Sequence, residues 1–226
     1  MPRYRGNAAR NWAIINGEKE FAQTIHLMIA ELDAGPIVLK KKAPIFSDTY
    51  IGELYDFVNN HTPSMFADSV DGFENETIIP TEQPKDPKKS LRGYPRLPLD
   101  SEIDWTKSAT FIDRVIRASS EPFMGAYTHL DSEKFIIWRA HVEKPEFSYL
   151  ASPGQILDRR KSTGEVVVAT GEGFLVIEDA ETEEFGRKKP IKIIKTIRTR
   201  LGLDISNEIV KCKREISDLK KLFEET

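Results

Sequence analysis

The stretch Thr24-Ile-His-Leu-Met-Ile-Ala-Glu-Leu-Asp-Ala-Gly-Pro-Ile37 has the pattern of a strand, a tight turn and a second strand. Isoleucine and leucine occupy every second position up to residue 29, which predicts a strand over Thr24–Ile29. Gly35-Pro36 marks the turn. A second short strand is expected over Ile37–Lys41.

Two titratable residues of this stretch, His26 and Asp33, are candidates for acid–base chemistry, because imidazole and carboxylate groups commonly transfer protons. Taken singly, each has a simpler interpretation. A histidine on a strand is more often a structural residue, and an aspartate before Ala-Gly-Pro is more often a turn former. Residue types alone therefore leave the role of both residues open.

Apolar residues at helical spacing predict helices elsewhere in the chain, and short β-type runs bounded by Gly, Pro, Ser or Asp predict strands in its second half. The helices are expected over Ala8–Glu18, Asp48–Phe73 (with Pro63 as a candidate kink) and Thr110–Ser119. The strands are expected over Ala126–Leu130, Lys134–Val142, Gly154–Asp158, Glu165–Ala169 and Phe174–Asp179. Several short strands at close spacing indicate a small barrel or sandwich.

Composition changes between residues 81 and 98, where four prolines and five Lys/Arg residues predict an extended linker. We therefore expect a first domain over residues 1–80, the linker over 81–98, a second domain over 99–203 and a terminal helix over 204–226.

The overall composition is that of an ordinary globular protein: 226 residues, 39% hydrophobic and 31% charged, with a formal net charge of −3. This charge favours neither nucleic acid nor a membrane surface as a partner. No segment approaches the ~20 apolar residues of a membrane span. The single cysteine, Cys212, excludes an internal disulfide and fits a cytoplasmic location. The four scattered histidines indicate no metal site.

The tail, residues 204–225, has apolar residues at alternating spacings of four and three, which predicts a helix with one apolar stripe. Two interpretations are open. The helix docks on its own domain, which we expect, or it dimerises as a short coiled coil.

The blocks around the opening stretch resemble the signature of formyltransferases that use 10-formyltetrahydrofolate. They are Pro2-Arg-Tyr-Arg-Gly6, Asn11-Trp-Ala-Ile-Ile-Asn-Gly-Glu18, Thr24-Ile-His26 and Leu32-Asp-Ala-Gly-Pro-Ile37. Later blocks resemble the second domain of the methionyl-tRNA and amino-sugar branches. These include Pro95-Arg-Leu-Pro98, Ile103-Asp-Trp105, Gly125-Ala-Tyr-Thr128 and Ile137-Trp-Arg-Ala140. The resemblance spans about residues 1–203.

The resemblance implies a fold and a set of site residues. The fold is α/β plus β: the C-terminal part of a Rossmann-like catalytic domain, a small OB-like β-barrel domain and a C-terminal helix. Asp33 matches the family's catalytic Asp, and His26 matches a second His that holds the Asp loop and a water. The pterin of the folate would lie against the loop backbone at Met28, Ile29, Ala30, Glu31 and Leu32. Substrate contacts are implied for Arg5, Gly6 and Arg96.

The family's catalytic Asn and main His belong to an Asn-x-His-x-Ser motif just before the block that matches Pro2–Gly6, and this sequence does not contain that motif. Two explanations are open: the start codon is placed too far downstream, which we favour, or the chain is genuinely shortened. In the second case we expect the chain to act with a separate N-terminal half, to form a homodimer, or to be a binding or regulatory remnant. The acceptor expected for an active enzyme is an amine. The resemblance to the amino-sugar branch implies a place near a sugar nucleotide for Arg96, which favours a nucleotide-linked amino sugar, since Arg suits phosphate contact; a solvated charge on the linker is an equal alternative. The alternative is methionyl-tRNA, to which the basic run Arg187–Arg200 could bind; such a run is more often a solvated face.

Overall fold

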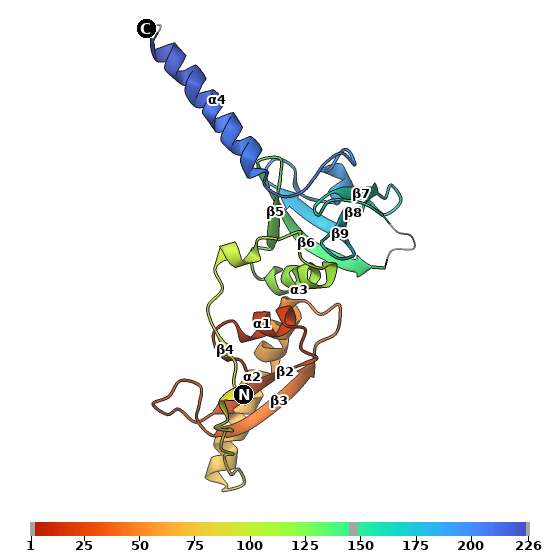
Figure 1. Ribbon diagram of the computed structural model, residues 1–226. Helices are drawn as coiled ribbons and strands as arrows, with labels where there is room; N and C mark the ends of the chain where they lie inside the picture. The colour runs from red at the N-terminus through yellow and green to blue at the C-terminus, as the bar shows by residue number, and fades with distance from the viewer. Residues whose placement is uncertain (1–2, 145–148, 225–226) are drawn as a thin grey trace. The chain divides into compact units, whose positions relative to one another are not determined.

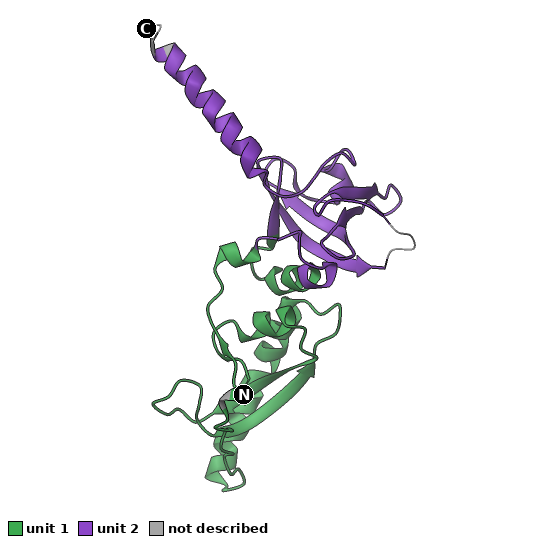
Figure 2. Cartoon of the chain, viewed as in Figure 1, with its two compact units in different colours: residues 1–101, 113–126 green, residues 102–112, 127–226 purple. Residues whose placement is uncertain are grey.

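The computed structural model describes residues 3–144 and 149–224. It divides the chain into two compact units, coloured separately in Figure 2. Unit 1 comprises residues 1–101 and 113–126, and unit 2 comprises residues 102–112 and 127–226. The first boundary falls close to the expected linker, but the chain returns to unit 1 for one further segment.

Unit 1 is built from two small sheets and two helices (Figure 1). Its elements are β1 (Arg5–Gly6), α1 (Ala9–Ile15), β2 (Glu20–His26), β3 (Ile37–Pro44), α2 (Ile51–Glu74) and β4 (Arg92–Gly93). Strands β2 and β3 form an antiparallel pair, and β1 runs parallel to β4. The second pairing joins the beginning of the chain to the stretch expected to be a linker.

The first predicted strand is displaced from its expected position. It begins at Glu20, pairs with β3 from Glu20↔Pro44 onward, and ends at His26 after a register irregularity between Ile25 and His26. Met28 and Ile29 therefore lie in the loop after the strand rather than on it.

The core of unit 1 forms where α1 and the start of α2 pack together. Its buried residues are Ala13, Ile14, Ile15, Ile45, Ile51, Leu54 and Ala118. Asn11 supports this core from α1, because its buried amide donates a hydrogen bond of 2.8 Å to the carbonyl oxygen of Ala118. Helix α2 continues through Pro63, as the helical spacing predicted, although Phe66 and Val70 on its later turns remain exposed.

Unit 2 contains one open sheet with the strand order β5-β6-β9-β8-β7, and β10 pairs with β9. The strands are β5 (Ala126–Leu130), β6 (Glu133–Glu143), β7 (Ile156–Arg159), β8 (Val166–Ala169), β9 (Phe174–Thr182) and β10 (Gly186–Lys188). The four segments β5 to β8 and the start of β9 agree with the sequence prediction, whereas β10 was not predicted. The described residues form no closed barrel, and the fold as a whole is a mixed α/β arrangement.

The interior of this sheet is apolar, as the sequence of its strands requires. Helix α3 (Ala109–Ser119) is divided between the two units, and its first turn belongs to unit 2. Fully buried side chains of unit 2 include Phe135, Ile137, Ile156, Val166, Val168, Leu175 and Ile177. The indole nitrogen of Trp105 donates a hydrogen bond of 2.9 Å to the Thr128 hydroxyl, so the buried polar atom of this tryptophan is satisfied.

Helix α4 (Ile205–Glu224) is the last element of unit 2 and occupies the range predicted for the tail helix. Its described apolar residues are largely exposed, from 45% for Val210 to 81% for Phe223. This differs from the expectation that the stripe docks on its own domain. Within the described ranges, no helix is long and apolar enough to cross a membrane.

Candidate functional site

The loop between β2 and β3 carries the candidate site, and its ends are held together by backbone contacts. The Leu27 N–H donates to the carbonyl oxygen of Pro36 at 2.9 Å. Gly35 lies so close to Leu27 that an added Cβ would stand 1.8 Å from the Leu27 carbonyl oxygen. Asp33 has a φ of 57°, a left-handed conformation that Asp tolerates better than most residues. The backbone therefore requires glycine at position 35 and suits aspartate at position 33.

A buried glutamine holds this loop from a distant part of the chain. Gln83 is 4% exposed, and its Nε2 donates to the carbonyl oxygens of Asp33 at 3.0 Å and of Gly35 at 2.7 Å. Its Oε1 accepts from Nη2 of Arg5 at 2.9 Å. The sequence analysis missed Gln83, and no pattern in the sequence singles it out from the proline-rich stretch around it.

The carboxylate of Asp33 is held between β1 and the end of β2. Its Oδ2 accepts a hydrogen bond of 2.7 Å from the backbone N–H of Gly6. Its Oδ1 lies 3.7 Å from Nε2 of His26. Both side chains keep about a fifth of their area exposed, 19% for His26 and 22% for Asp33. The structure thus brings together three of the residues predicted from the sequence.

The hydrogen bond at the other ring nitrogen decides what His26 presents to Asp33. Nδ1 lies 2.9 Å from the carbonyl oxygen of Leu27, and a carbonyl can only accept, so Nδ1 carries a proton. In a neutral imidazole, Nε2 then carries a lone pair. A donor placed between Nε2 and the Asp33 carboxylate, such as a water or an amine, is attracted by both groups. The pair can therefore position a donor and accept its proton.

The segment from Met28 to Leu32 forms the outer part of the loop and is exposed. Met28 is 94% exposed, Ile29 50% and Leu32 63%. Nη1 of Arg5 lies 3.7 Å from a carboxylate oxygen of Glu31, a weak ion pair beside the Gly6–Asp33 contact. The exposed side chains of Met28, Ile29 and Leu32 give this loop an apolar outer surface.

The structure gives Arg96 a different set of neighbours. Its Nη2 donates to the carbonyl oxygen of Asp100 at 2.7 Å, and its Nη1 and Nη2 each lie 3.2 Å from the Ser119 hydroxyl. The guanidinium also lies over the ring of Trp12, 5.9 Å from its centroid. Burial lowers the pKa of Arg96. Arg96 therefore ties the segment after β4 to the end of α3 inside unit 1.

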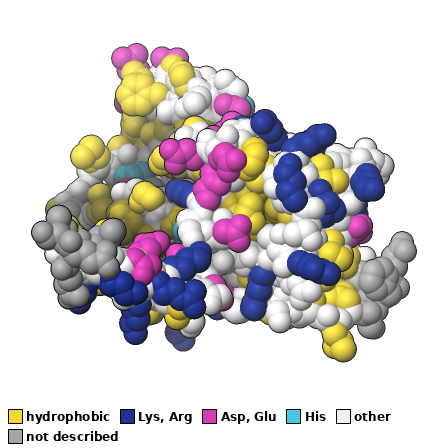
Figure 3. All heavy atoms as spheres, turned by 90° about the horizontal axis from the view of Figure 1, so that it is seen from above, with side chains coloured by type: hydrophobic (Ala, Val, Ile, Leu, Met, Phe, Trp, Pro, Cys, Tyr) yellow, Lys and Arg dark blue, Asp and Glu magenta, His cyan; other side chains and the backbone are white. Residues whose placement is uncertain are grey.

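The basic residues of the run Arg187–Arg200 are exposed, whereas Pro190, Ile193 and Ile194 between them are buried. Several of the cations have partners within unit 2. Arg187 pairs with Asp179 at 2.8 Å, Lys189 donates to the Glu178 carbonyl at 3.2 Å, and Arg200 donates to the Pro153 carbonyl at 3.0 Å. On the face drawn in Figure 3, Lys and Arg side chains occur in separate groups with acidic side chains among them. These features fit a solvated face, one of the two interpretations of this run.

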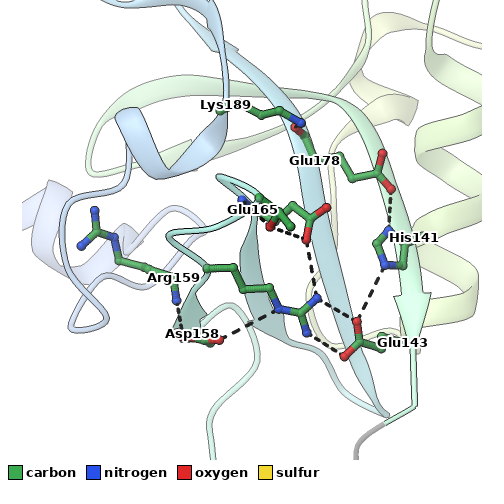
Figure 4. Close-up of polar contacts among 9 residues, drawn as sticks. His141, Glu143, Asp158, Arg159, Glu165, Glu178 and Lys189 are labelled. Carbon is green, nitrogen blue, oxygen red and sulfur yellow. Dashed lines mark hydrogen bonds and ion pairs between the residues drawn. The ribbon is translucent and has the colours of Figure 1, made fainter.

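A second polar cluster lies on the sheet of unit 2 (Figure 4). Arg160 binds the Glu143 carboxylate with two hydrogen bonds of 2.8 and 2.6 Å and lies 3.6 Å from Glu165. His141 lies between Glu143 and Glu178. The hydrogen bonds from Arg160 hold the pKa of Glu143 below its usual value. Arg160 and His141 thus pair with the carboxylates, and no metal-binding group of three or more ligands exists among the described residues.

Two protein-family models match successive parts of the chain. The family model "Formyl transferase" matches residues 1–70, and "Formyl transferase, C-terminal domain" matches residues 98–200. The methionyl-tRNA formyltransferase of Clostridium novyi (strain NT) is 35% identical over 201 residues, which are 88% of this chain and 61% of that protein. The chain therefore spans less than two thirds of the length of this relative.

Solved structures show the same fold. HypX from Aquifex aeolicus in complex with tetrahydrofolic acid has a TM-score of 0.63 and 20% identity, over 87% of this chain and 34% of that chain. The N-formyltransferase from Helicobacter canadensis, in complex with folinic acid and dTDP-3-aminofucose, has a TM-score of 0.60 and 17% identity, over 79% of this chain and 62% of that chain. The match of both family models, in order along one chain, shows that the protein belongs to the formyl transferase family.

Proposed function

We propose that this chain supplies the Asp33–His26 part of a site that transfers a formyl group from 10-formyltetrahydrofolate to a primary amine. One observation carries the proposal: Oδ2 of Asp33 accepts the Gly6 N–H at 2.7 Å while Oδ1 faces His26 at 3.7 Å. Three blocks of the formyltransferase signature, separated in sequence, therefore meet at one carboxylate.

The chemistry of formyl transfer requires such a group. The amine nitrogen attacks the formyl carbon, the carbonyl oxygen becomes an oxyanion, and the bond from that carbon to the folate nitrogen then breaks. The attacking amine must lose a proton, and the leaving folate nitrogen must gain one. Asp33 and the lone pair on Nε2 of His26 hold the water or amine through which this proton moves. The fixed Nδ1–H to Leu27 contact keeps the imidazole in the tautomer that this role needs.

The exposed loop Met28–Leu32 supplies the surface for the pterin ring. The exposed side chain of Met28 can pack against the ring, since ligand sites combine apolar contacts with a few polar groups. A folate bound at this surface would bring its formyl group close to Asp33, because Met28–Leu32 and Asp33 belong to the same loop.

For the acceptor, the observations favour methionyl-tRNA over a nucleotide-linked amino sugar. The amino-sugar expectation rested on Arg96, whose guanidinium is engaged with Asp100 and Ser119 inside unit 1. The relative that is 35% identical is named as a methionyl-tRNA formyltransferase. The amino sugar remains the second candidate, because a solved structure of the same fold contains dTDP-3-aminofucose.

The family's Asn and main His complete the mechanism and are not contained in this sequence. We infer that unit 1 belongs to a Rossmann-like catalytic domain whose other segments carry these two residues, and that unit 2 corresponds to an OB-like domain. Phe66, Val70 and Phe73 support this inference, since they form an exposed apolar row on α2. A cytoplasmic location fits a chain with a single cysteine.

The test measures folate binding and formyl transfer separately. Folinic acid is titrated into the full chain, and formylated product is then measured by mass spectrometry with 10-formyltetrahydrofolate and either acceptor, in the presence of the N-terminal segment. Asp33→Asn should leave folinic acid binding within a few-fold and reduce transfer by about 10²–10⁴-fold, the range of a lost acid–base group. Asp131→Asn is the matched control, because Asp131 has a similar φ of 54° in a turn of unit 2.

Two outcomes would contradict the proposal in different ways. An unchanged rate for Asp33→Asn would remove Asp33 from the mechanism. Folinic acid binding without product from either acceptor would identify the chain as a binding or regulatory remnant.

A further inference from the structure

Helix α4 presents a continuous apolar stripe that unit 2 does not cover. The residues of this stripe are Ile205, Ile209, Cys212, Ile216, Leu219 and Phe223, and each of them is exposed. The described contacts between α4 and the rest of unit 2 lie near its first turns, where Ser132 meets Glu208 at 2.7 Å and Lys211 at 3.3 Å. In Figure 1 the helix extends away from the sheet beyond these contacts.

The spacing of the stripe assigns each residue a place in a heptad. Steps of four and three residues make Ile209, Ile216 and Phe223 the a positions and Ile205 and Leu219 two of the d positions. Cys212 occupies the remaining d position. Ile209 and Ile216 at a and Leu219 at d match the pattern that favours two-stranded parallel coiled coils, whereas Phe223 at a and Ile205 and Cys212 at d are apolar without matching it. The 20 residues of α4 provide about three heptads, which is near the shortest length that sustains a coiled coil.

The charges that flank the stripe then decide the orientation of the partner. Glu208 and Glu215 occupy g positions, and Lys213 and Lys220 occupy e positions. In a parallel pair each g residue faces the e residue of the following heptad on the other helix, so both contacts are glutamate with lysine. In an antiparallel pair, g faces g and e faces e, which places like charges together.

We propose that α4 pairs with α4 of a second copy of this chain in a parallel, in-register coiled coil. The apolar stripe supplies the buried seam, and the complementary charges select an identical partner in the parallel orientation. A helix docked on its own domain would need no such order of charges along both edges of the stripe. The reduced thiol of Cys212 packs in the seam as a small apolar group.

The first measurement is the mass of the full chain in solution by sedimentation equilibrium. We expect about twice the chain mass of 25.8 kDa at micromolar concentration. A protein that is still monomeric at about 100 µM, a concentration at which pairs with micromolar dissociation constants associate, would overturn the proposal.

Charge reversal tests the flanking contacts. Lys213→Glu with Lys220→Glu makes all four flanking residues acidic and should weaken dimerisation at least tenfold. Glu208→Lys with Glu215→Lys should do the same, and an equimolar mixture of the two double variants should dimerise again. The matched control is Arg214→Glu with Lys221→Glu, which changes the charge equally at outward f positions and should leave the dimer intact. Equal loss in the control would refute the assignment of the heptads.

Cysteine cross-linking tests the orientation. In the parallel, in-register pair, each d residue faces its own copy, so Leu219→Cys in a Cys212→Ser background should form a disulfide-linked dimer rapidly when an added oxidant takes up the two electrons and two protons. Arg214→Cys in the same background is the control, because position f points away from the partner. In an antiparallel pair position 219 lies near position 209 of the other helix, so a dimer that does not cross-link at 219 would overturn the parallel arrangement.

Discussion

Replacing Gln83 with leucine should loosen the loop that carries Asp33 without disturbing the rest of unit 1. The glutamine amide donates to two backbone carbonyls, of Asp33 and Gly35, and accepts from the guanidinium of Arg5. Leucine fills a similar volume but makes none of these hydrogen bonds. The carbonyl oxygens of Asp33 and Gly35 and the guanidinium of Arg5 would then lose this hydrogen-bond partner. The position is buried, since Gln83 is 4% exposed.

The size of the effect follows from the kinds of bond that are lost. A neutral hydrogen bond contributes about 0.5–1.5 kcal/mol and one to a charged group about 1.5–3 kcal/mol. The total loss is the sum over two neutral hydrogen bonds and one to a charged group. We take a value near the lower end of that sum, about 3 kcal/mol, because water reaches part of the opened loop and the leucine side chain is itself buried. At about 1.4 kcal/mol per factor of ten, the open form of the loop becomes roughly 100-fold more populated.

Amide hydrogen exchange measures this opening directly. The N–H groups of Leu27, Ile37 and Thr81 are hydrogen-bonded within the loop and its closing bridge, so their exchange should accelerate by roughly the same 100-fold factor. Gln155→Leu is the matched control, since Gln155 is exposed in unit 2 and its substitution should leave these three amides unchanged.

Exchange of the three amides within about threefold of the unmodified protein would refute the role of Gln83. A general acceleration across unit 1, rather than at the loop, would show that the glutamine supports the whole unit instead. Either result would also weaken the account of how Asp33 is held.

Two further changes test neighbouring features. Gly35→Ala should disrupt the loop, because the added methyl would lie 1.8 Å from the Leu27 carbonyl oxygen; circular dichroism and folinic acid binding should show the loss, whereas Gly186→Ala, with open space around its Cβ, should retain binding with at most a small loss of stability from its positive φ. Burial raises the pKa of Glu18, but the hydrogen bonds from the Tyr4 hydroxyl and from Arg3 outweigh it, so the net pKa lies below its ordinary value. Stability from this group is present above the unfolded pKa and is lost as pH falls below about 4.3. Glu18→Gln should therefore make unit 1 less stable near neutral pH and less sensitive to acid, as measured by urea denaturation from pH 3 to pH 7; an unchanged acid sensitivity would contradict this assignment.

Local patterns in the sequence predicted the elements of the fold well. The helical spacing from Ile51 to Val70 and the β-type runs around Phe135 and Val166 need only near neighbours to be recognised, and they form the helix and strands expected. The start of β2 was missed because Glu20 is polar and its strand character depends on pairing with Pro44 of β3. Pairing partners far along the chain leave little trace in local composition.

Local patterns also predicted only some of the residues of the candidate site. Asp33 and His26 were predicted from the ordered signature blocks, and the contact between them is found. Gln83 was not predicted, because its importance comes from burial against a loop 50 residues earlier. Arg96 was assigned to a ligand because its charge suggested phosphate, whereas the structure engages its guanidinium with Asp100 and a serine. Residue type indicates what a side chain can do, and tertiary structure decides which partner it meets.

The long separation between Asp33 and the residue that holds its loop has a consequence during synthesis. A chain leaving the ribosome exposes the Asp33 loop before Gln83 has been added, and the two are 50 residues apart. At about 5–20 residues per second this interval lasts roughly 3–10 s. Strand β1 stays unpaired for longer still, because its partner strand Arg92–Gly93 is synthesised later. For those seconds the nascent chain carries an exposed loop without its buried glutamine, and Met28 and Leu32 at its surface are open to chaperones and proteases.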